Sequence, residues 1–399
     1  MEVTIGAGNN GDPQPVPFTN ITTGEGSDAP GFYNVQNGDA PYMKYLADTY
    51  TLSDNMHQSF MGGTGPNHIM FGYADAMWYS DGNGNTTTPP TDQIENPNPQ
   101  PGTNNWYDQD GYSGGSYSEC ANVGQPGVPA VVNYLESLST PIPPRCTPKA
   151  YYLLNNYNPA YVGNGTPELP YSAFTIPPTT QPHIGDVLST AGISYTYFGE
   201  GWDLYVTDPA GVNPYDAYCN ICNPFQYASD IMTNPTEIAA HIQDTTALYE
   251  DIDLGNLPAV SIVKPSGFVD GHPASSKLDL FEGFVNNIVN KVQASSLWSS
   301  TAIFITFDEG GGYYDSGYIQ PVDFFGDGTR IPLLIVSQYS TGGIVNRSYA
   351  DHVSIIKIIE QNWGTPTIGP KTRDNFPNPN PVVGKNPYVP TNKIVVQLV

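Results

Sequence analysis

Residues 301–315 read TAIFITFDEGGGYYD, an apolar run that ends in two adjacent carboxylates and a glycine-rich turn. The run has the length and the β-branched and aromatic content of a buried strand. Asp308 and Glu309 follow it side by side, and burying two carboxylates together is costly unless a cation lies between them. The pattern therefore favours a hard divalent metal ion at this point. The alternative is that both carboxylates are solvated and begin an ordinary turn.

Further strands and helices alternate along the chain around this stretch. Strands are predicted at 151–154, 193–198, 259–263 and 331–337, and helices at 68–78, 183–191, 234–252, 276–292 and 351–364. Asn234 with Pro235, Ser276 and Asp351 are expected to begin three of the helices. Such alternation predicts an α/β fold with a mainly parallel sheet that helices cover on both faces.

The composition limits the classes of partner. The 399 residues include 13 Lys and Arg against 38 Asp and Glu, a net charge of -25. Without a basic cluster, neither nucleic acid nor anionic lipid is an expected partner. A hydrophobic content of 39% and 28 Tyr argue against disorder, although 41 Gly and 39 Pro indicate many loops. The longest apolar runs are strand-sized, so no transmembrane segment is expected, and the oligomeric state is left open.

The cysteines and glycosylation sequons favour an oxidising compartment. Cys120 and Cys146 flank a Pro/Gly-rich stretch, while Cys219 and Cys222 lie in YCNIC. We expect two disulfides; four buried thiols or a zinc site are the alternatives. Sequons occur at Asn20, Asn85, Asn164 and Asn346. The chain is therefore predicted to be secreted, extracellular or periplasmic, although no leader pattern follows Met1.

Three segments differ in composition. Residues 1–41 are rich in Gly, Asn, Pro and Thr and are predicted to form an extended N-terminal arm. Residues 42–370 form the predicted folded domain, with a loop-rich insertion at about 80–150 that we expect beside the site. Residues 371–399 form a Pro/Asn-rich C-terminal tail, which ends in the apolar sequence IVVQLV and is predicted to act as a clasp.

A second candidate for chemistry is GGTGPNH, residues 62–68. The glycines allow a tight turn, and Thr64 then places a hydroxyl near the N-terminus of a helix. Such a position stabilises an alkoxide and attracts phosphate, because free amides and the helix dipole converge there. Asn67 and His68 add donors on the same turn. The alternative is that Thr64 is only a helix N-cap.

The histidines supply further candidates. His272 and His352 begin loops or helices after predicted strands. His272 is suited to hold the charge of a phosphate or to protonate a leaving oxygen, and His352 to support a metal-bound carboxylate. His57 is a weaker candidate. A structural role is the alternative for each, and His183 and His241 are expected to be structural.

Taken together, these motifs resemble the phosphoesterase family, which joins bacterial acid phosphatases with non-specific phospholipases C. Thr64-Gly65-Pro66-Asn67 is similar to the nucleophile turn of that family. The remaining matches are Trp298 with TAIFITF and DEGGGYYD, His272-Pro273, Arg330 to Ser337, and Asp351 to Glu360. The likeness is strong over residues 42–78 and 258–364 and looser between them.

The resemblance implies a three-layer α/β/α sandwich of the alkaline-phosphatase-like type. It also implies one divalent metal ion and a small phosphate ester or phospholipid head group as substrate, cleaved through a phospho-threonine intermediate. The implied residues are Thr64 as nucleophile and metal ligand, Asn67 and His272 as phosphate contacts, Asp308 and Glu309 as metal ligands, and His352 and Asp315 as further members of the site.

Two departures from the family pattern stand out. Family members open with an apolar strand ending in Glu-Asn, whose residues bind metal, and no such strand precedes residue 42 here. The chain is then a processed product, receives those ligands from another chain, or is inactive. The family His after the Tyr-Asp pair is replaced by Ser316, so its role would pass to His57 or His68.

Because of these departures, two alternative functions are considered beside phosphoester hydrolysis. A non-catalytic extracellular structural protein would retain the fold without the metal. A sulfatase or phosphonate hydrolase on the same fold is a third reading. Bound metal and phosphoester hydrolysis would distinguish the enzyme from the structural protein.

Overall fold

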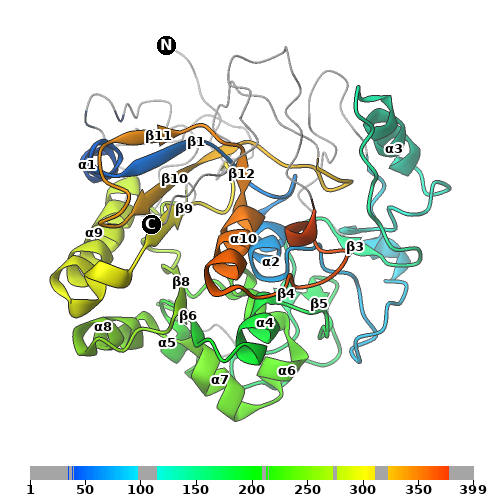
Figure 1. The fold of residues 1–399 in the computed structure, drawn as a ribbon. Helices are drawn as coiled ribbons and strands as arrows, with labels where there is room; N and C mark the ends of the chain where they lie inside the picture. Colours follow the sequence, from blue (N-terminus) through cyan, green and yellow to red (C-terminus); the bar gives the residue numbers. More distant parts are fainter. Residues whose placement is uncertain are drawn as a thin grey trace, which may run out of the picture.

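The computed structural model describes residues 35, 38, 40–97, 115–208, 213, 215–272, 276–310 and 322–376. Most of the predicted arm, together with Asp315, Ser316 and the terminal IVVQLV, lies outside these ranges. The longer helices are α1 (Pro41–Thr49), α2 (Thr64–Tyr73), α3 (Val128–Ser137), α4 (Ile184–Thr190), α5 (Trp202–Thr207), α6 (Ser229–Met232), α7 (Pro235–His241), α8 (Thr245–Leu254), α9 (Leu278–Ala294) and α10 (His352–Trp363) (Figure 1). None of the described helices has both the length and the apolar character needed to cross a bilayer.

The strands form two main sheets. The larger one has the order β11-β1-β10-β9, with β12 also paired to β1, and the second has the order β7-β6-β8. Their bounds are β1 Thr51–His57, β9 Ile303–Thr306, β10 Arg330–Val336, β11 Ile344–Asn346 and β12 Ala350–Asp351, then β6 Tyr195–Gly199, β7 Ile242–Gln243 and β8 Val260–Lys264. Short pairs join β2 (Tyr117–Ser118) to β3 (Tyr152–Leu153) and β4 (Asn158–Pro159) to β5 (Thr175–Ile176). The α/β prediction is therefore confirmed.

The larger sheet is mixed rather than parallel throughout. Strand β10 runs antiparallel to both β1 and β9, whereas β6 runs parallel to β7 and β8. A parallel connection needs a crossover of a dozen or more residues, usually a helix. The described residues between β9 and β10, 307–310 and 322–329, contain no helix, in agreement with the antiparallel pairing of these strands.

Helices pack on both faces of the larger sheet. Leu334 and Val336 of β10 share a cluster with α1 and α9, while the alternating Leu333 and Ile335 share a cluster with α10. Because successive side chains of a strand point to opposite faces, α9 and α10 lie on opposite sides of β10. Figure 1 shows α10 next to α2 on one side and α9 on the other.

Local sequence signals placed several elements correctly. Asp351 caps α10 by accepting a hydrogen bond from the amide of Ser354, and Gly364 ends that helix in the left-handed conformation. Asn234 caps α7 by accepting from the amide of Thr236. The single helix predicted over 234–252 is wrong, because residues 242–243 leave the helix to pair with β6 and Asp244 caps a new helix, α8.

The expected cap at Ser276 is also wrong. Helix α9 begins at Leu278 with Lys277 as its N-cap. The hydroxyl of Ser276 instead accepts from the amide of Gly271 and donates to the carbonyl of Phe268. It therefore holds the loop between β8 and α9.

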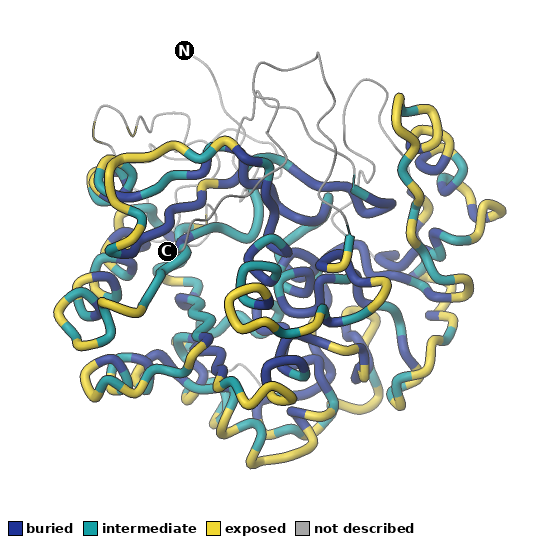
Figure 2. Tube along the Cα trace, in the orientation of Figure 1, coloured by how far each residue is buried: buried dark blue, intermediate teal, exposed yellow. Residues whose placement is uncertain are grey.

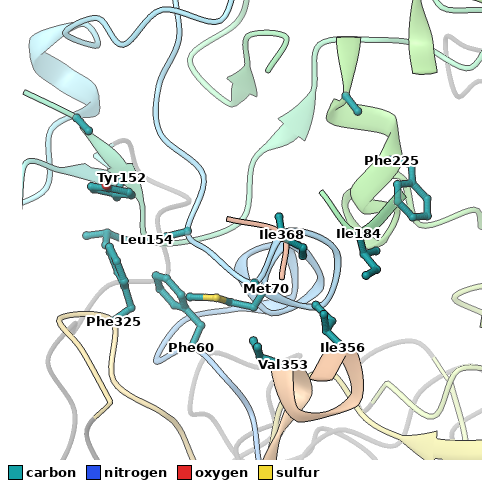
Figure 3. Packing of buried hydrophobic residues seen from close by; sticks show 14 of the residues in the cluster. Phe60, Met70, Tyr152, Leu154, Ile184, Phe225, Phe325, Val353, Ile356 and Ile368 are labelled. Carbon is teal, nitrogen blue, oxygen red and sulfur yellow. The ribbon is translucent and has the colours of Figure 1, made fainter. Parts of the chain in front are cut away.

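The largest apolar cluster joins α2 to α10 and to the segments beside the second sheet. Figure 3 shows Met70 of α2 among Phe60, Val353 and Ile356, with Phe325 beside Tyr152. The buried part of the tube in Figure 2 follows α2 and the strands, and exposed residues lie on the outer helices. Gly72 allows α2 to pack closely, since an added Cβ would lie 2.4 Å from Cβ of Pro224. Helix α2 is thus held rigidly from several sides.

Both predicted disulfides are present. Cys120 is bonded to Cys146, and Cys219 to Cys222. The alternatives of four free thiols and of a zinc site built on these residues are therefore wrong. The first bond closes part of the loop-rich region, where α3 is the described helix.

A buried arginine joins the end of the described chain to the sheet. The guanidinium of Arg373 donates to Asp327 at 2.8 Å, to Asp323 at 3.0 Å and to Asp351 at 3.3 Å. All four residues are buried. Burial is the main cause that raises the pKa of Asp327 well above its usual range, and the negative charge of Asp351 adds to it. Although Arg373 falls in the predicted tail, it fixes the residue that caps α10.

Asp75 lies beside this cluster and should make stability depend on pH. Burial is the main cause that raises the pKa of Asp75 from 3.8 to about 7, and the negative charge of Asp323 adds to it. At pH values between 3.8 and about 7, Asp75 keeps its proton in the folded protein but has released it in the unfolded chain. The free energy of unfolding should therefore fall as the pH rises from about 4 to about 7, by on the order of 3 kcal/mol.

Urea denaturation across this pH range tests the assignment. We expect Asp75→Asn to flatten the curve relative to wild type, whereas Asp92→Asn at an exposed position should leave it unchanged. A curve for Asp75→Asn that parallels wild type would contradict the role given to Asp75.

Candidate active site

The first turn of α2 meets the residues that follow β9. The hydroxyl of Thr64 donates a hydrogen bond of 2.8 Å to Oε1 of Glu309. Gly63, not Thr64, is the N-cap residue of α2, and no side chain caps this end. The alternative of Thr64 as an N-cap is therefore wrong, and its hydroxyl faces a carboxylate from the other end of the chain.

Two asparagines fix the turn that carries Thr64. The side chain of Asn67 accepts from the amide of Phe60 and donates to the carbonyls of Phe60, Gly62 and Gly63. The side chain of Asn156 accepts from the amide of Gly65 at 2.6 Å. These contacts use the amide of Asn67 to hold the loop. Contact between Asn67 and phosphate stays a prediction.

Gln58 holds the backbone just after Glu309. Its side-chain oxygen accepts from the amide of Gly310 at 2.8 Å and from the hydroxyl of Thr329 at 3.1 Å, and its nitrogen donates to the carbonyl of Phe60 at 2.8 Å. One side chain therefore connects the loop before Thr64 to the turn that carries Glu309.

Together with Thr64 and Glu309, the side chains of His68, Asp308 and Lys264 form the polar group of the site. Nδ1 of His68 lies 3.0 Å from the carbonyl oxygen of Thr64 and 3.8 Å from Oδ2 of Asp308. Burial lowers the pKa of His68 to about 4, against the effect of Asp308, so its ring is neutral at pH 7 and Nδ1 donates to Thr64. Burial raises the pKa of Asp308, but the charge of His68, which is protonated only at low pH, and that of Lys264 outweigh burial, and the net shift is downward.

The pKa of Glu309 is shifted upward, in contrast to that of Asp308. Burial is the main cause that raises the pKa of Glu309 to about 7, and the negative charge of Asp308 adds to it. The hydrogen bond from Thr64 lowers this pKa but does not cancel the rise. Two adjacent carboxylates therefore have pKa values pushed apart by their surroundings. Such a separation is typical of a functional site.

His352 is buried behind the two carboxylates and is fixed by the backbone. Its Nδ1 accepts from the amide of Ser59 at 3.3 Å, so Nε2 carries the proton and donates to the carbonyl of Phe307 at 2.9 Å. Burial lowers the pKa of His352. A neutral ring thus links the loop before Thr64 to the residue before Asp308.

The other two predicted histidines, His57 and His272, differ in their positions. The ring nitrogens of His57 lie 2.9 Å from the carbonyl of Gly328 and 3.1 Å from Oδ1 of Asn55. His57 is buried in the sheet, and these two contacts do not involve Thr64 or Glu309. His272 is exposed at the wall of the cavity that contains the site. Asp315 is outside the described residues, so its role stays a prediction.

The cavity is unusually large, at about 2130 Å³. Thr64, His68, Asp308, Glu309 and Lys264 line one part of it, and apolar residues of α9, α10 and the strands line the rest. Ordinary ligand pockets measure roughly 300–1,000 Å³. The polar group is therefore reachable from the cavity, and much of the remaining volume is apolar.

The polar group fits a hard divalent cation by its donor chemistry. Thr64, Asp308 and Glu309 offer oxygen atoms, the ligands that Mg²⁺, Ca²⁺ and Mn²⁺ prefer. Burial, and after it the negative charge of Asp308, raises the pKa of Glu309. A bound cation would favour the charged form of both carboxylates.

A second group of metal-ligand type lies at the far end of α2, where the ring of His183 packs against Tyr73. Ligand atoms of His183, Asp186 and Asp230 lie within 4.8 Å of one another. Asp186 accepts from the amide of His183 at 2.9 Å, and Nε2 of His183 lies 3.3 Å from Asp230. These contacts hold the start of α4 against α6, in agreement with the structural role expected for His183.

Sequence reasoning missed Lys264, Gln58 and Asn156. Lys264 ends β8, and its Nζ donates to Asp270 at 3.0 Å. A lysine at the carboxyl end of a buried strand was the available signal, because ligands bind there in open α/β sheets. Gln58 and Asn156 gave no signal, since the contacts that bring them to the site are with Gly310 and Gly65, which are distant in the sequence.

The sequence was compared with known proteins. A family model described as "Phosphoesterase family" matches residues 28–366. Phospholipase C B from Mycobacterium tuberculosis is 24% identical over 390 residues, which cover 90% of this chain and 57% of that protein. Non-hemolytic phospholipase C from Pseudomonas aeruginosa is 24% identical over 398 residues, covering 88% and 44%. An acid phosphatase from Aspergillus niger is 24% identical over 199 residues, covering 48% and 44%.

The chain thus spans about half the length of the curated relatives that it matches. Among solved structures, a protein in the alkaline phosphatase superfamily from Vibrio parahaemolyticus aligns with a TM-score of 0.32 and 14% identity, over 54% of this chain and 56% of that one. A score at this level does not establish a common fold.

Proposed function

The chain belongs to the phosphoesterase family, and on that basis we propose that it hydrolyses phosphoric esters with the help of a divalent metal ion. The observation that supports this best is the 2.8 Å hydrogen bond between Thr64 and Glu309. It joins two motifs that are 245 residues apart and that the family resemblance assigns to one site.

Thr64 is the proposed nucleophile. Its Oγ1 would bond to phosphorus as the bond between phosphorus and the alcohol oxygen breaks, and the alcohol would leave with a proton. Water would then break the bond between phosphorus and Oγ1 and restore the hydroxyl. Glu309 orients the hydroxyl before attack, and His272 is proposed to contact the phosphate or to protonate the leaving oxygen.

Thr64, Asp308 and Glu309 are the proposed ligands of the metal ion. Bound there, the ion would lower the pKa of the hydroxyl and offset the negative charge of the phosphate. Lys264 adds positive charge near Asp308. The proposed substrate is a small phosphate ester or a phospholipid head group, and the proposed location is outside the cytoplasm, which fits the two disulfides.

Metal removal tests the proposal. We expect the purified chain to bind one divalent ion and to release p-nitrophenol from p-nitrophenyl phosphate or p-nitrophenylphosphorylcholine. Dialysis against EDTA should abolish the release, and Mg²⁺, Mn²⁺ or Ca²⁺ should restore it. The two substrates separate monoester from diester cleavage.

Matched variants identify which cluster holds the ion. Glu309→Gln should lower the metal content, whereas Asp186→Asn in the second cluster should not. A protein without metal that cleaves neither ester would support the structural alternative instead. Loss of metal with Asp186→Asn alone would move the site to the second cluster.

A further inference from the structure

The large cavity runs along two open strand edges. Every residue of 258–265 and of 299–310 lines it, and these ranges contain β8 and β9. Successive side chains of a strand point to opposite faces, so a cavity that touches consecutive residues runs along the edge of the strand. In the described part of the chain, β8 pairs with β6 and β9 with β10, each on one edge (Figure 1).

The open edges restrict what can fill the cavity. Each edge carries backbone amides and carbonyls that need hydrogen-bond partners, and an apolar surrounding makes unpaired groups costly. Acyl chains cannot supply such partners. An extended peptide can, since it offers donors and acceptors on both of its edges.

The geometry also defines the kind of strand that fits. Lys264 ends β8, Asp308 follows β9, and both residues line the cavity. Ile288 of α9 and Ile358 of α10 line the cavity from the two helices that lie on opposite faces of β10. A strand placed here would be covered on both faces. Such strands are nearly continuous apolar runs.

We propose that residues 394–399, IVVQLV, occupy this gap as a strand between β8 and β9 and join the two sheets into one. Five of these six residues are Ile, Val or Leu, and the run is as long as the strands beside it. It is the segment outside the described residues that best meets the requirement for a fully buried strand.

The described chain ends close enough for this segment to reach the gap. The carbonyl of Phe376 accepts a hydrogen bond of 2.8 Å from Lys357 of α10, and the neighbouring Ile358 and Ile359 line the cavity. One helix diameter, about 10 Å, therefore separates Phe376 from the cavity wall. The 17 residues between Phe376 and Ile394 can span up to about 56 Å.

Residues 1–34 are the main competing segment, because Val35 also lines the cavity. They contain many Gly, Asn, Pro and Thr residues and no apolar run of comparable length. Glycine and proline both weaken a central strand. This segment is therefore a poorer match than IVVQLV.

Photo-crosslinking of the full chain tests the proposal directly. With p-benzoylphenylalanine in place of Val396, mass spectrometry should find crosslinks to 258–265, 299–310 or α9. The same probe in place of Val383, in the same tail but outside the segment, should give at least tenfold fewer of these crosslinks. Hydrogen exchange should show slow amides in both β8 and β9 of the wild type.

Two variants add an independent measurement. Val396→Asp should speed exchange of the β8 and β9 edge amides at least tenfold and leave the interior of β1 and β6 slow, while Val383→Asp should match wild type. A peptide of residues 390–399 should restore protection to a chain that ends at Lys393.

Several results would overturn the proposal. One is fast exchange of these edges in the wild type. Another is loss of protection of the edge amides when residues 1–34 are deleted but not when residues 394–399 are deleted. A third is protection that rises with protein concentration, which would indicate that a second copy of the chain covers the edges. None of these measurements depends on hydrolytic activity.

Discussion

Thr64→Ala is expected to lower hydrolysis of p-nitrophenyl phosphate by at least about 10³-fold, because it removes the proposed nucleophile. The substitution deletes one hydrogen bond, that to Glu309, and a hydrogen bond to a charged group contributes roughly 1.5–3 kcal/mol to stability. The folded structure should therefore survive. Steady-state kinetics and urea denaturation of the same preparation separate the effect on activity from the effect on folding.

Thr64→Ser is the matched control, since it keeps a hydroxyl at the same backbone position. We expect it to retain measurable activity and, after acid quenching, to carry a phosphoryl group on residue 64, as wild type should. Activity in Thr64→Ala close to that of wild type would show that another group attacks phosphorus. A phosphoryl group trapped on a different residue would show the same.

Arg373→Leu is expected to destabilise the fold by about 3–5 kcal/mol, which is the usual cost of leaving buried charges without their partner. Three carboxylates, those of Asp323, Asp327 and Asp351, would lose their shared guanidinium. Asp351 caps α10, so this helix should be the first element to lose protection from hydrogen exchange. The free energy of unfolding in urea gives the measurement.

Arg347→Leu provides the comparison for a surface arginine. Arg347 is exposed and lies 3.8 Å from Asp54, and exposed ion pairs contribute at most about 1 kcal/mol. A loss below about 1 kcal/mol in Arg373→Leu would mean that the carboxylates take up protons without disturbing the fold. The triple replacement of Arg373, Asp323 and Asp327 by apolar residues should recover part of the loss.

The sequence predicted elements whose causes are local. Asp351 and Asn234 cap their helices through the amide of a residue two or three positions ahead, and such contacts can be read from neighbouring letters. The break between α7 and α8 could not be read this way, because it depends on pairing of Ile242 with Tyr197 of β6. The antiparallel direction of β10 likewise depends on its pairing with β1 and β9, which no local pattern specifies.

The residues of the candidate site also divide into those that local sequence predicts and those that depend on distant contacts. Thr64, Asp308 and Glu309 were identified because they stand at the ends of periodic segments, where polar residues are unexpected. Gln58 and Asn156 hold those residues in place from 252 and 91 positions away, respectively. Their types are common in loops, so only the three-dimensional structure identifies them.

The ring of His352 has a consequence for how this protein can change over evolution. It binds the amide of Ser59 with one nitrogen and the carbonyl of Phe307 with the other, so it spans three stretches that mutate independently. The partner at position 307 is a backbone carbonyl, so the side chain there can change while the contact persists, whereas replacing the imidazole removes both contacts at once. We therefore expect position 352 to vary less among homologues than position 307.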